Sequence, residues 1–484
     1  MNEISNVNFY KPVKPVGIGT FSVPQKTSKG GKSAPAFGNN ELQNYSAGGA
    51  DRINTPNNPF PDIKKMYSKV AKATDAEGRA LLNKLYKNGK LLSRDSSDGT
   101  STLQNLYNIA TKPRLKIFDR KNIIRETLKT IDNPFLITQN IGVIPESRMN
   151  GYLQTANQRL LAETEQAKAQ GDFNPDDIAD QYPIKPQDVN GIHSATCAAS
   201  SIEFDMAYRR PAEFTRYIEG FTSPAKQVKT TVKYADLSPD MTEALTALVS
   251  QKAEFAPIDW EHVEITIRPD ENAYMRADVQ EDARVKNTRS MVDVLMQGAF
   301  MELGSRNTYN GLTDKRSKEV GGGGGLNQFE IAFVESIVDS KSRKIPIVYM
   351  ELDDDMTKIT KRYYTHEQIK QHYLNAIDMK KSVITGFLTD IDDKDNVITP
   401  QGHEIIIVDK AYDKNGKLHF VYQDSDDKDF FAPSYIAADE LIPKIHHANI
   451  AQDALKEPIE QPDMRFVYLS ELKNLRNKHA ATQI

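Results

Sequence analysis

The residue best suited to covalent chemistry is Cys197, the only cysteine among the 484 residues of the chain. A single cysteine excludes both an intramolecular disulfide and a structural zinc site built from several thiolates. Ser194 and Thr196 are good helix-capping residues, and apolar residues then recur at helical spacing as far as Met206. Cys197 is therefore expected in the first turn of a helix, where free backbone N–H groups and the helix dipole stabilise a thiolate. The alternative is that Cys197 is a small, inert, buried hydrophobic residue.

A base for this thiol is offered by His403, which stands at the start of an apolar strand predicted over 403–408. Residues 413–416 (Asp-Lys-Asn-Gly) have a strong hairpin-turn sequence, and a return strand is predicted over 418–422. Because a hairpin brings the start of its first strand beside the end of its second, His403 and Asp424 should lie together. A histidine oriented by a carboxylate is what activation of a thiol requires. The alternative is a locally hydrogen-bonded histidine and an aspartate in a solvated acidic run.

Two other features invite a ligand-binding interpretation. Five glycines, 321–325, precede a predicted helix, but no Lys-Ser/Thr pair follows them as in a phosphate-binding P-loop. Glycines also let a peptide backbone approach closely, since they have no Cβ. The acidic residues within 424–429 lack the glycine and the final glutamate of a calcium-binding loop. The sequence therefore predicts no metal and no cofactor.

Composition limits the classes of partner. The chain has 62 Lys and Arg and 66 Asp and Glu residues, a net charge of −4, and no long basic run, so nucleic-acid binding is not expected. No stretch has the apolar length of a secretory signal or a membrane span. We therefore expect a protein that does not bind membranes and is cytoplasmic, or exported without a classical signal peptide. The oligomeric state is left open.

The residues before Cys197 fall into two parts. Residues 1–58 are rich in Asn, Gly, Pro, Ser and Lys and are predicted to be a disordered arm. Residues 59–175 carry amphipathic helical patterns, with Thr74 and Glu77 spaced as a capping box. Whether these helices limit access to Cys197 or support it is left open. Beyond Cys197, strands are predicted over 228–234, 263–267, 345–350 and 382–387, and helices over 239–252, 290–304 and 365–379.

Three separated blocks resemble, in the same order, the papain-like cysteine peptidases. The segment from Cys197 to Ser201 (Cys-Ala-Ala-Ser-Ser) is similar to the Cys-Trp-Ala-Phe-Ser that begins the family's central helix. Gly324 and Gly325, followed by leucine, resemble the Gly-Gly-Leu segment that lines its substrate cleft. His403, an apolar strand, a glycine-containing turn and Asp424 followed by serine resemble its histidine-to-Asn-Ser block.

This resemblance implies an α+β, papain-like, two-lobed fold. A helical lobe would carry Cys197, and an antiparallel β-sheet lobe would carry His403 and Asp424. The papain-like domain would span 176–447, with an insertion at about 207–320, between the N-terminal helical region at 59–175 and a C-terminal helical tail at 448–484. The implied activity is hydrolysis of a protein or peptide substrate by a Cys-His-Asp triad through a thioacyl intermediate, without a cofactor.

The chain also departs from the family pattern. Gly191 stands where the family has its oxyanion-hole glutamine, so Asn190 or Gln187 is the expected donor beside the backbone N–H of Cys197. Asp426 replaces the tryptophan that shields the orienting residue from water. The separation between the cysteine and the histidine exceeds the roughly 130–150 residues of simple family members, which an insertion would explain. These departures leave two alternatives: a catalytically inactive papain-like domain that binds proteins, and an acyltransferase or deamidase with the same triad.

Overall fold

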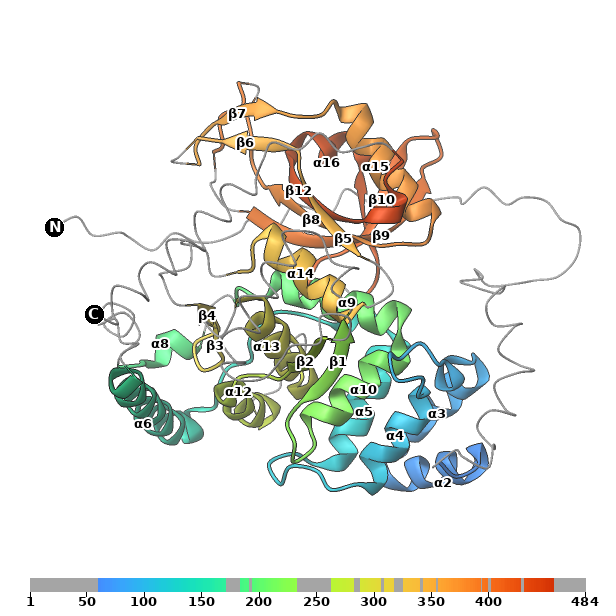
Figure 1. The fold of residues 1–484 in the computed structure, drawn as a ribbon, viewed down its shortest axis with the longest axis vertical. Helices are drawn as coiled ribbons and strands as arrows, with labels where there is room; N and C mark the ends of the chain where they lie inside the picture. The colour runs from blue at the N-terminus through green and yellow to red at the C-terminus, as the bar shows by residue number, and fades with distance from the viewer. Residues whose placement is uncertain are drawn as a thin grey trace, which may run out of the picture.

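The structure is a computed structural model of the chain. It describes residues 60–170, 183–190, 194–232, 263–282, 288–305, 309–316, 325–339, 343–353, 356–392, 394–398, 402–427 and 431–456. The predicted N-terminal arm, the predicted helix at 239–252, Gly324 and residues 457–484 of the predicted tail lie outside them. The described chain combines helices with antiparallel sheets, so the predicted α+β class is confirmed (Figure 1).

Within the described residues, the largest sheet has six strands in the order β11, β10, β9, β8, β12, β5, and every neighbouring pair is antiparallel. The strands are β5 Lys344–Val348, β8 Val383–Leu388, β9 Gly402–Tyr412, β10 Leu418–Gln423, β11 Ser434–Ala437 and β12 Ile445–Ala451. The strands predicted near 345, 382, 403 and 418 are thus confirmed. The predicted start of a helical tail at residue 448 is wrong, because β12 continues through this position in the middle of its pairing with β5.

The hairpin between β9 and β10 has the predicted turn. The side chain of Asp413 accepts hydrogen bonds from the backbone N–H groups of Asn415 and Lys417, both at 2.8 Å. Gly416 has φ = 78°, a left-handed conformation that glycine adopts without steric cost. The conformation of the turn is therefore determined by residues 413–417 themselves, and the turn fixes which residues of β9 and β10 are opposite each other.

Each face of the sheet is covered by helices. On one face, α15 (His366–Asp378) and α16 (Ala438–Leu441) close a core that includes Tyr373, Ile405 and Phe420. On the other face, α9 (Cys197–Arg209) and α14 (Gln328–Val338) pack against the strands. In Figure 1 these two helices lie where the sheet, with α15 and α16 above, meets the helices below. They are therefore the elements that join the two parts of the molecule.

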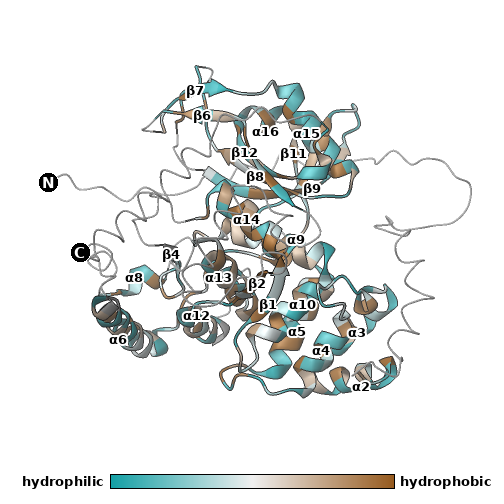
Figure 2. Cartoon of the chain, viewed as in Figure 1, coloured by the Kyte–Doolittle hydropathy of each residue, from teal (hydrophilic) through white to brown (hydrophobic). Residues whose placement is uncertain are grey.

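The N-terminal helices share one hydrophobic core with α9. These helices are α2 Ile63–Ala73, α3 Ala76–Lys87, α4 Thr102–Thr111 and α5 Arg120–Asp132, and the later helices of the same core are α10 Pro211–Phe221 and α13 Met291–Ser305. The core joins residues as distant in sequence as Leu106, Phe204 and Phe300, all fully buried. Hydrophobic segments gather at α13, α9 and β8 in Figure 2. The helices before residue 133 thus belong to the same core as the helix that carries Cys197, and α5 contacts that helix.

A smaller core holds α6 (Glu146–Gln170), which packs with α8 (Pro186–Val189) and α12 (Glu271–Asp282) through residues such as Tyr152, Val189 and Val279. The predicted strands near 228 and 263 are confirmed as β1 (Val228–Val232) and β2 (Val263–Ile267), which pair with each other in an antiparallel ladder. The remaining short strands form two further pairs, β3 Tyr309–Asn310 with β4 Lys315–Arg316, and β6 Met350–Leu352 with β7 Ile359–Arg362.

Two predicted helix starts can be compared with the structure. Ser290 caps α13 as predicted: its hydroxyl accepts from the N–H of Asp293, whose carboxylate accepts from the N–H of Ser290. The predicted cap at Thr74 is wrong by one residue. Asp75 is the cap of α3, with its side chain accepting from the N–H of Gly78 at 2.8 Å. Both residue types can cap a helix, and the aspartate, which also pairs with Arg125, takes the position.

Candidate active site

Cys197 is the first residue of α9, as the sequence predicts, and its side chain is partly exposed. Thr196 occupies the N-cap position, but its side chain does not cap the helix. The hydroxyl of Thr196 instead donates to Oε1 of Gln297 at 2.8 Å. The backbone N–H groups of the first turn therefore have no side-chain cap, and they remain available, with the positive end of the helix dipole, to a thiolate or an oxyanion at Cys197.

His403 lies at the start of β9, opposite Phe387 of β8. The two rings meet edge to face, with their centroids 6.0 Å apart, and His403 is only 7 % exposed. Its Nε2 is 2.7 Å from Oδ1 of Asp424, and the thiol of Cys197 interacts with the same imidazole and helps to raise its pKa. Because Asp424 occupies Nε2, the ring presents Nδ1 to the thiol. The structure thus brings Cys197, His403 and Asp424 together at one site.

The position of Asp424 depends on an irregularity in the hairpin. The β9–β10 register shifts between Val421, which is opposite Asp409, and Tyr422, which is opposite Ile407. Val408 is therefore a bulged residue, and such a bulge re-aims the residues at the end of the strand. Asp424 follows directly after β10, and its Oδ1 also accepts the backbone N–H of Asp426 at 2.9 Å. This second bond fixes the carboxylate that orients the imidazole.

Charge and burial shift the pKa values of His403 and Asp424 in opposite directions. Burial alone would lower the pKa of His403, but the charge and hydrogen bond of Asp424, aided by Cys197, raise the pKa of His403 well above its ordinary value. Burial would raise the pKa of Asp424, yet the charge and hydrogen bond of His403 keep the pKa of Asp424 below its ordinary value. Both shifts favour an ionised carboxylate beside an imidazolium, the state that stabilises a neighbouring thiolate.

Substitution of Asp424 by alanine is expected to move the onset of Cys197 alkylation to higher pH. The carboxylate raises the pKa of His403, so without it the imidazolium that stabilises the thiolate is less populated near pH 6. The rate of alkylation by iodoacetamide between pH 5 and 9 measures this onset. Asp426→Ala is the matched control, because it keeps the backbone N–H that Asp426 donates to Asp424. Equal profiles for the Asp424→Ala protein and the unmodified protein would contradict the assigned role.

The two predicted oxyanion donors lie in different surroundings. Asn190 accepts from the N–H of Ile144 at 2.8 Å and donates to the carbonyl oxygen of Ile144 at 3.3 Å. Its side chain thus holds the backbone before α6. Gln187 is exposed on the short helix α8. In the described part of the chain, neither side chain hydrogen-bonds to Cys197, His403 or Asp424.

A different amide, Gln139, lies beside the site and was not predicted. Its backbone N–H donates to the carbonyl oxygen of Ser425 at 3.0 Å, directly after Asp424. Gln139 is only 5 % exposed, and its Oε1 has no hydrogen-bond partner among the described residues. The nearest sequence signal is the run Thr-Gln-Asn at 138–140, which follows a helix in a polar, irregular segment. Nothing in that run indicates contact with residues almost three hundred positions later.

Gln139 is also close to Cys197. The amide of Gln297 donates to the carbonyl oxygen of Thr138 at 3.0 Å and accepts from the hydroxyl of Thr196 at 2.8 Å. Since an amide separates its own nitrogen and oxygen by about 2 Å, these two threonine oxygens are at most about 8 Å apart. Thr138 precedes Gln139, and Thr196 precedes Cys197. The segment is therefore near both the nucleophile and the Asp424 loop.

Gly325, one of the two predicted cleft glycines, lies against the segment before the nucleophile. A Cβ on Gly325 would be 3.2 Å from the carbonyl oxygen of Ala195, a tight contact. The helix that follows, α14, is capped by Asn327, which accepts from the N–H groups of Phe329 and Glu330. The glycine thus allows close approach to the chain's own backbone beside Cys197.

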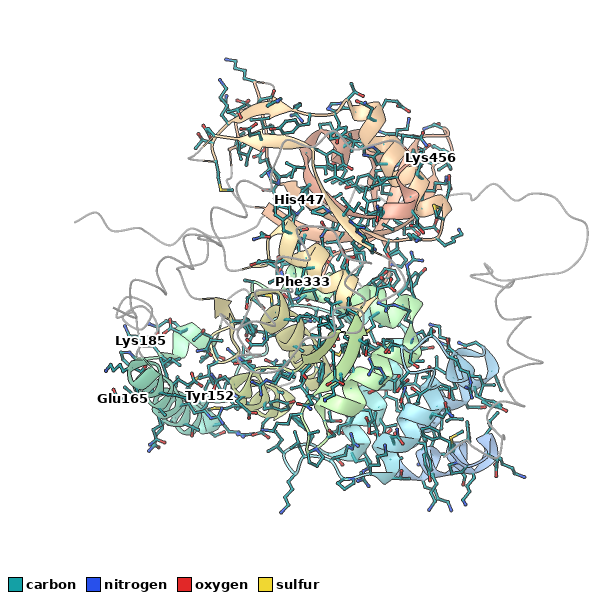
Figure 3. The ribbon with its side chains drawn as sticks, viewed as in Figure 1. Tyr152, Glu165, Lys185, Phe333, His447 and Lys456 are labelled. Carbon is teal, nitrogen blue, oxygen red and sulfur yellow. The ribbon has the colours of Figure 1, made fainter. Side chains whose placement is uncertain are left out.

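A second imidazole–carboxylate pair lies deeper in the sheet. Nε2 of His447 on β12 is 2.9 Å from Oε1 of Glu404, the residue after His403. Figure 3 labels His447 within the sheet and Phe333 on α14 below it (Figure 3). Successive side chains of a strand point to opposite faces of the sheet, so Glu404 and His403 lie on different faces. The His447 pair has no described contact with Cys197.

No group of three or more histidine, cysteine, aspartate or glutamate side chains in the described ranges could hold a metal ion. In the same ranges, none of the helices combines the length and apolar character that crossing a membrane requires. No model of a known protein family matches the chain, and no curated protein is significantly similar to it.

Proposed function

We propose that the protein is a papain-like cysteine protease, with a two-lobed fold, that hydrolyses peptide bonds with Cys197, His403 and Asp424. One observation carries the proposal: a thiol at the start of a buried helix interacts with an imidazole, and that imidazole is 2.7 Å from a carboxylate. The three groups come from α9, β9 and the end of β10. The uncapped helix end and the raised pKa of His403 both favour the thiolate–imidazolium form that attacks an acyl carbon.

The proposed reaction follows from these positions. The thiolate of Cys197 attacks the peptide carbonyl carbon, and the carbonyl oxygen becomes an oxyanion. The imidazolium of His403 then gives its proton to the leaving amine, the C–N bond breaks, and a thioester remains on Cys197. Water, deprotonated by the now neutral imidazole, adds to the thioester and releases the carboxylic acid and the thiolate. Asp424 holds the ring orientation throughout.

The oxyanion needs hydrogen-bond donors that point at the former carbonyl oxygen of the substrate. The backbone N–H of Cys197 is one, because the first turn of α9 has no side-chain cap. For the second we propose the side-chain amide nitrogen of Gln139, a buried residue whose backbone N–H is bonded to the Asp424 loop, in place of Asn190 and Gln187. The amide of Asn190 is bound to Ile144, and a donor must lie within about 3 Å of the developing charge.

Labelling of the thiol tests the proposal. Iodoacetamide should alkylate Cys197 in the native protein at pH 6, where an ordinary thiol with a pKa of about 8.5 is almost unreactive. The labelled protein should lose activity on a mixture of unstructured peptides, and Cys197→Ser should lack both labelling and hydrolysis. Alkylation that occurs only after unfolding would contradict the proposal. Rapid labelling without peptide hydrolysis would instead support acyl transfer or deamidation by the same triad, and the absence of both would support a binding module.

A further inference from the structure

Gln297 on α13 is a fully buried residue with all of its polar groups in use. Its amide nitrogen donates to the carbonyl oxygen of Thr138 at 3.0 Å and to Oε2 of Glu203 at 3.1 Å. Its Oε1 accepts from the hydroxyl of Thr196 at 2.8 Å. One side chain therefore joins the residue before Cys197, the middle of α9 and the segment that contains Thr138.

The directions of these bonds are fixed by chemistry. An amide nitrogen has two hydrogens, and both are used, so Oε1 of Gln297 is left to accept. The hydroxyl of Thr196 must then donate its only hydrogen to Gln297. The Ser194 hydroxyl, 2.8 Å from that of Thr196, is in turn the donor to Thr196. The segment before Cys197 is thus bound in one orientation.

Thr138 continues the connection to the other side of the site. Its hydroxyl donates to the carbonyl oxygen of Ser425 at 2.7 Å, and the N–H of Gln139 donates to the same oxygen at 3.0 Å. The side chain of Gln423 donates to the carbonyl oxygen of Ile137 at 2.8 Å. The residues on both sides of Asp424 are therefore bound to one short segment, 137–139.

We infer that Thr138 and Gln297 are positioning residues that set the distance between the nucleophile and its base. Thr196–Gln297–Thr138–Ser425 is a hydrogen-bonded bridge from the residue before Cys197 to the residue after Asp424. Without it, α9 and the β9–β10 hairpin would be related by fewer directional contacts, and apolar packing restrains direction less than hydrogen bonds do. The inference rests on the proposed function, and it adds residues that touch neither substrate nor the reacting atoms.

The expected loss of rate depends on how far the nucleophile and its base are displaced from each other. A displacement of about 1 Å between reacting groups can cost about 10²-fold in rate. Thr138→Val keeps the shape of the side chain but removes the hydroxyl, which donates to Ser425 and also accepts the N–H of Asn140 at 3.1 Å. We expect kcat to fall about tenfold or more with KM nearly unchanged, and Cys197 to be alkylated several-fold more slowly at pH 6.

The test compares two buried threonines. Thr127, like Thr138, is buried and donates to a carbonyl oxygen at 2.7 Å, that of Ile123, but it does so within the single helix α5. Thr127→Val should lower the melting temperature by about as much as Thr138→Val and leave kcat and alkylation unchanged. Thr138→Ser, which keeps the hydroxyl, should restore both rates.

Each outcome decides between two explanations. If Thr138→Val and Thr127→Val have equal kcat and equal alkylation rates, the bridge has no positioning role and the inference is wrong. If Thr138→Ser is as slow as Thr138→Val, the methyl group and not the hydroxyl is responsible, which also overturns it. If the unmodified protein itself is neither alkylated at pH 6 nor active on peptides, the proposed function fails and takes this inference with it.

Discussion

Replacement of His403 by alanine is expected to lower kcat/KM on peptide substrates by about 10³- to 10⁴-fold. In the proposed mechanism the imidazole, which interacts with Cys197, takes the proton of the thiol and gives a proton to the leaving amine. Without it, the alkylation of Cys197 at pH 6 should become slow. Hydrolysis and iodoacetamide labelling, measured on the same preparation, check the two effects.

His419→Ala is the matched control for this variant. His419 is on β10 of the same hairpin, and its Nδ1 contacts the carbonyl oxygen of Lys417, far along the strand from Asp424. Its removal should leave the alkylation rate and kcat/KM unchanged. If His403→Ala is alkylated at pH 6 as fast as the unmodified protein, the reactivity of Cys197 does not come from this imidazole, and the triad is wrong.

The second large effect is expected at Gln139. Gln139→Ala should lower kcat by about 10²- to 10³-fold, since it removes a donor to the oxyanion of the transition state. The alkylation rate of Cys197 should change little, because alkylation by iodoacetamide forms no such oxyanion. This difference between hydrolysis and labelling separates a lost donor from a damaged nucleophile.

The other two amides give the controls for Gln139. Gln187→Ala should be active, because the residue is exposed on α8. Asn190→Ala should lower the free energy of unfolding by about 1–3 kcal/mol, since it leaves polar groups of Ile144 without partners, with a smaller effect on kcat. A large loss of kcat in Gln187→Ala, with normal activity in Gln139→Ala, would return the donor role to Gln187, one of the two amides predicted from the sequence.

Local chemistry explains why part of this site could be predicted. The turn at 413–416 is fixed by an aspartate that bonds its own neighbours and by a glycine with positive φ, so the hairpin could be predicted from these residues alone. Its two strands then had to bring His403 toward Asp424. The helix start at Cys197 was equally local, since it needs only polar residues before a helical apolar pattern.

Contacts between distant segments could not be predicted in this way. The bulge at Val408, which helps to aim Asp424, leaves no mark in the alternation of apolar residues. Gln139 meets Ser425 because two separate elements place it there, and its own neighbours do not indicate this contact. The predicted boundary at residue 175, between the N-terminal helical region and the papain-like domain, is a further example. Helical periodicity predicts which face of α4 is buried, but it cannot show that this face packs in the same core as α9.

The hydrogen bonds that hold the Asp424 loop to residues 137 and 138 join positions 286 and 287 residues apart. They have a consequence for the protein during its synthesis. A ribosome that adds about 5–20 residues per second would release Cys197 well before His403, by roughly 10–40 s. During that interval the nascent helices can collapse around α9, but the thiol has no base and its helix has no sheet to rest on. A chain that is still attached to the ribosome should therefore be chemically inert, and pulse labelling with a thiol reagent should find reactive protein only among completed chains.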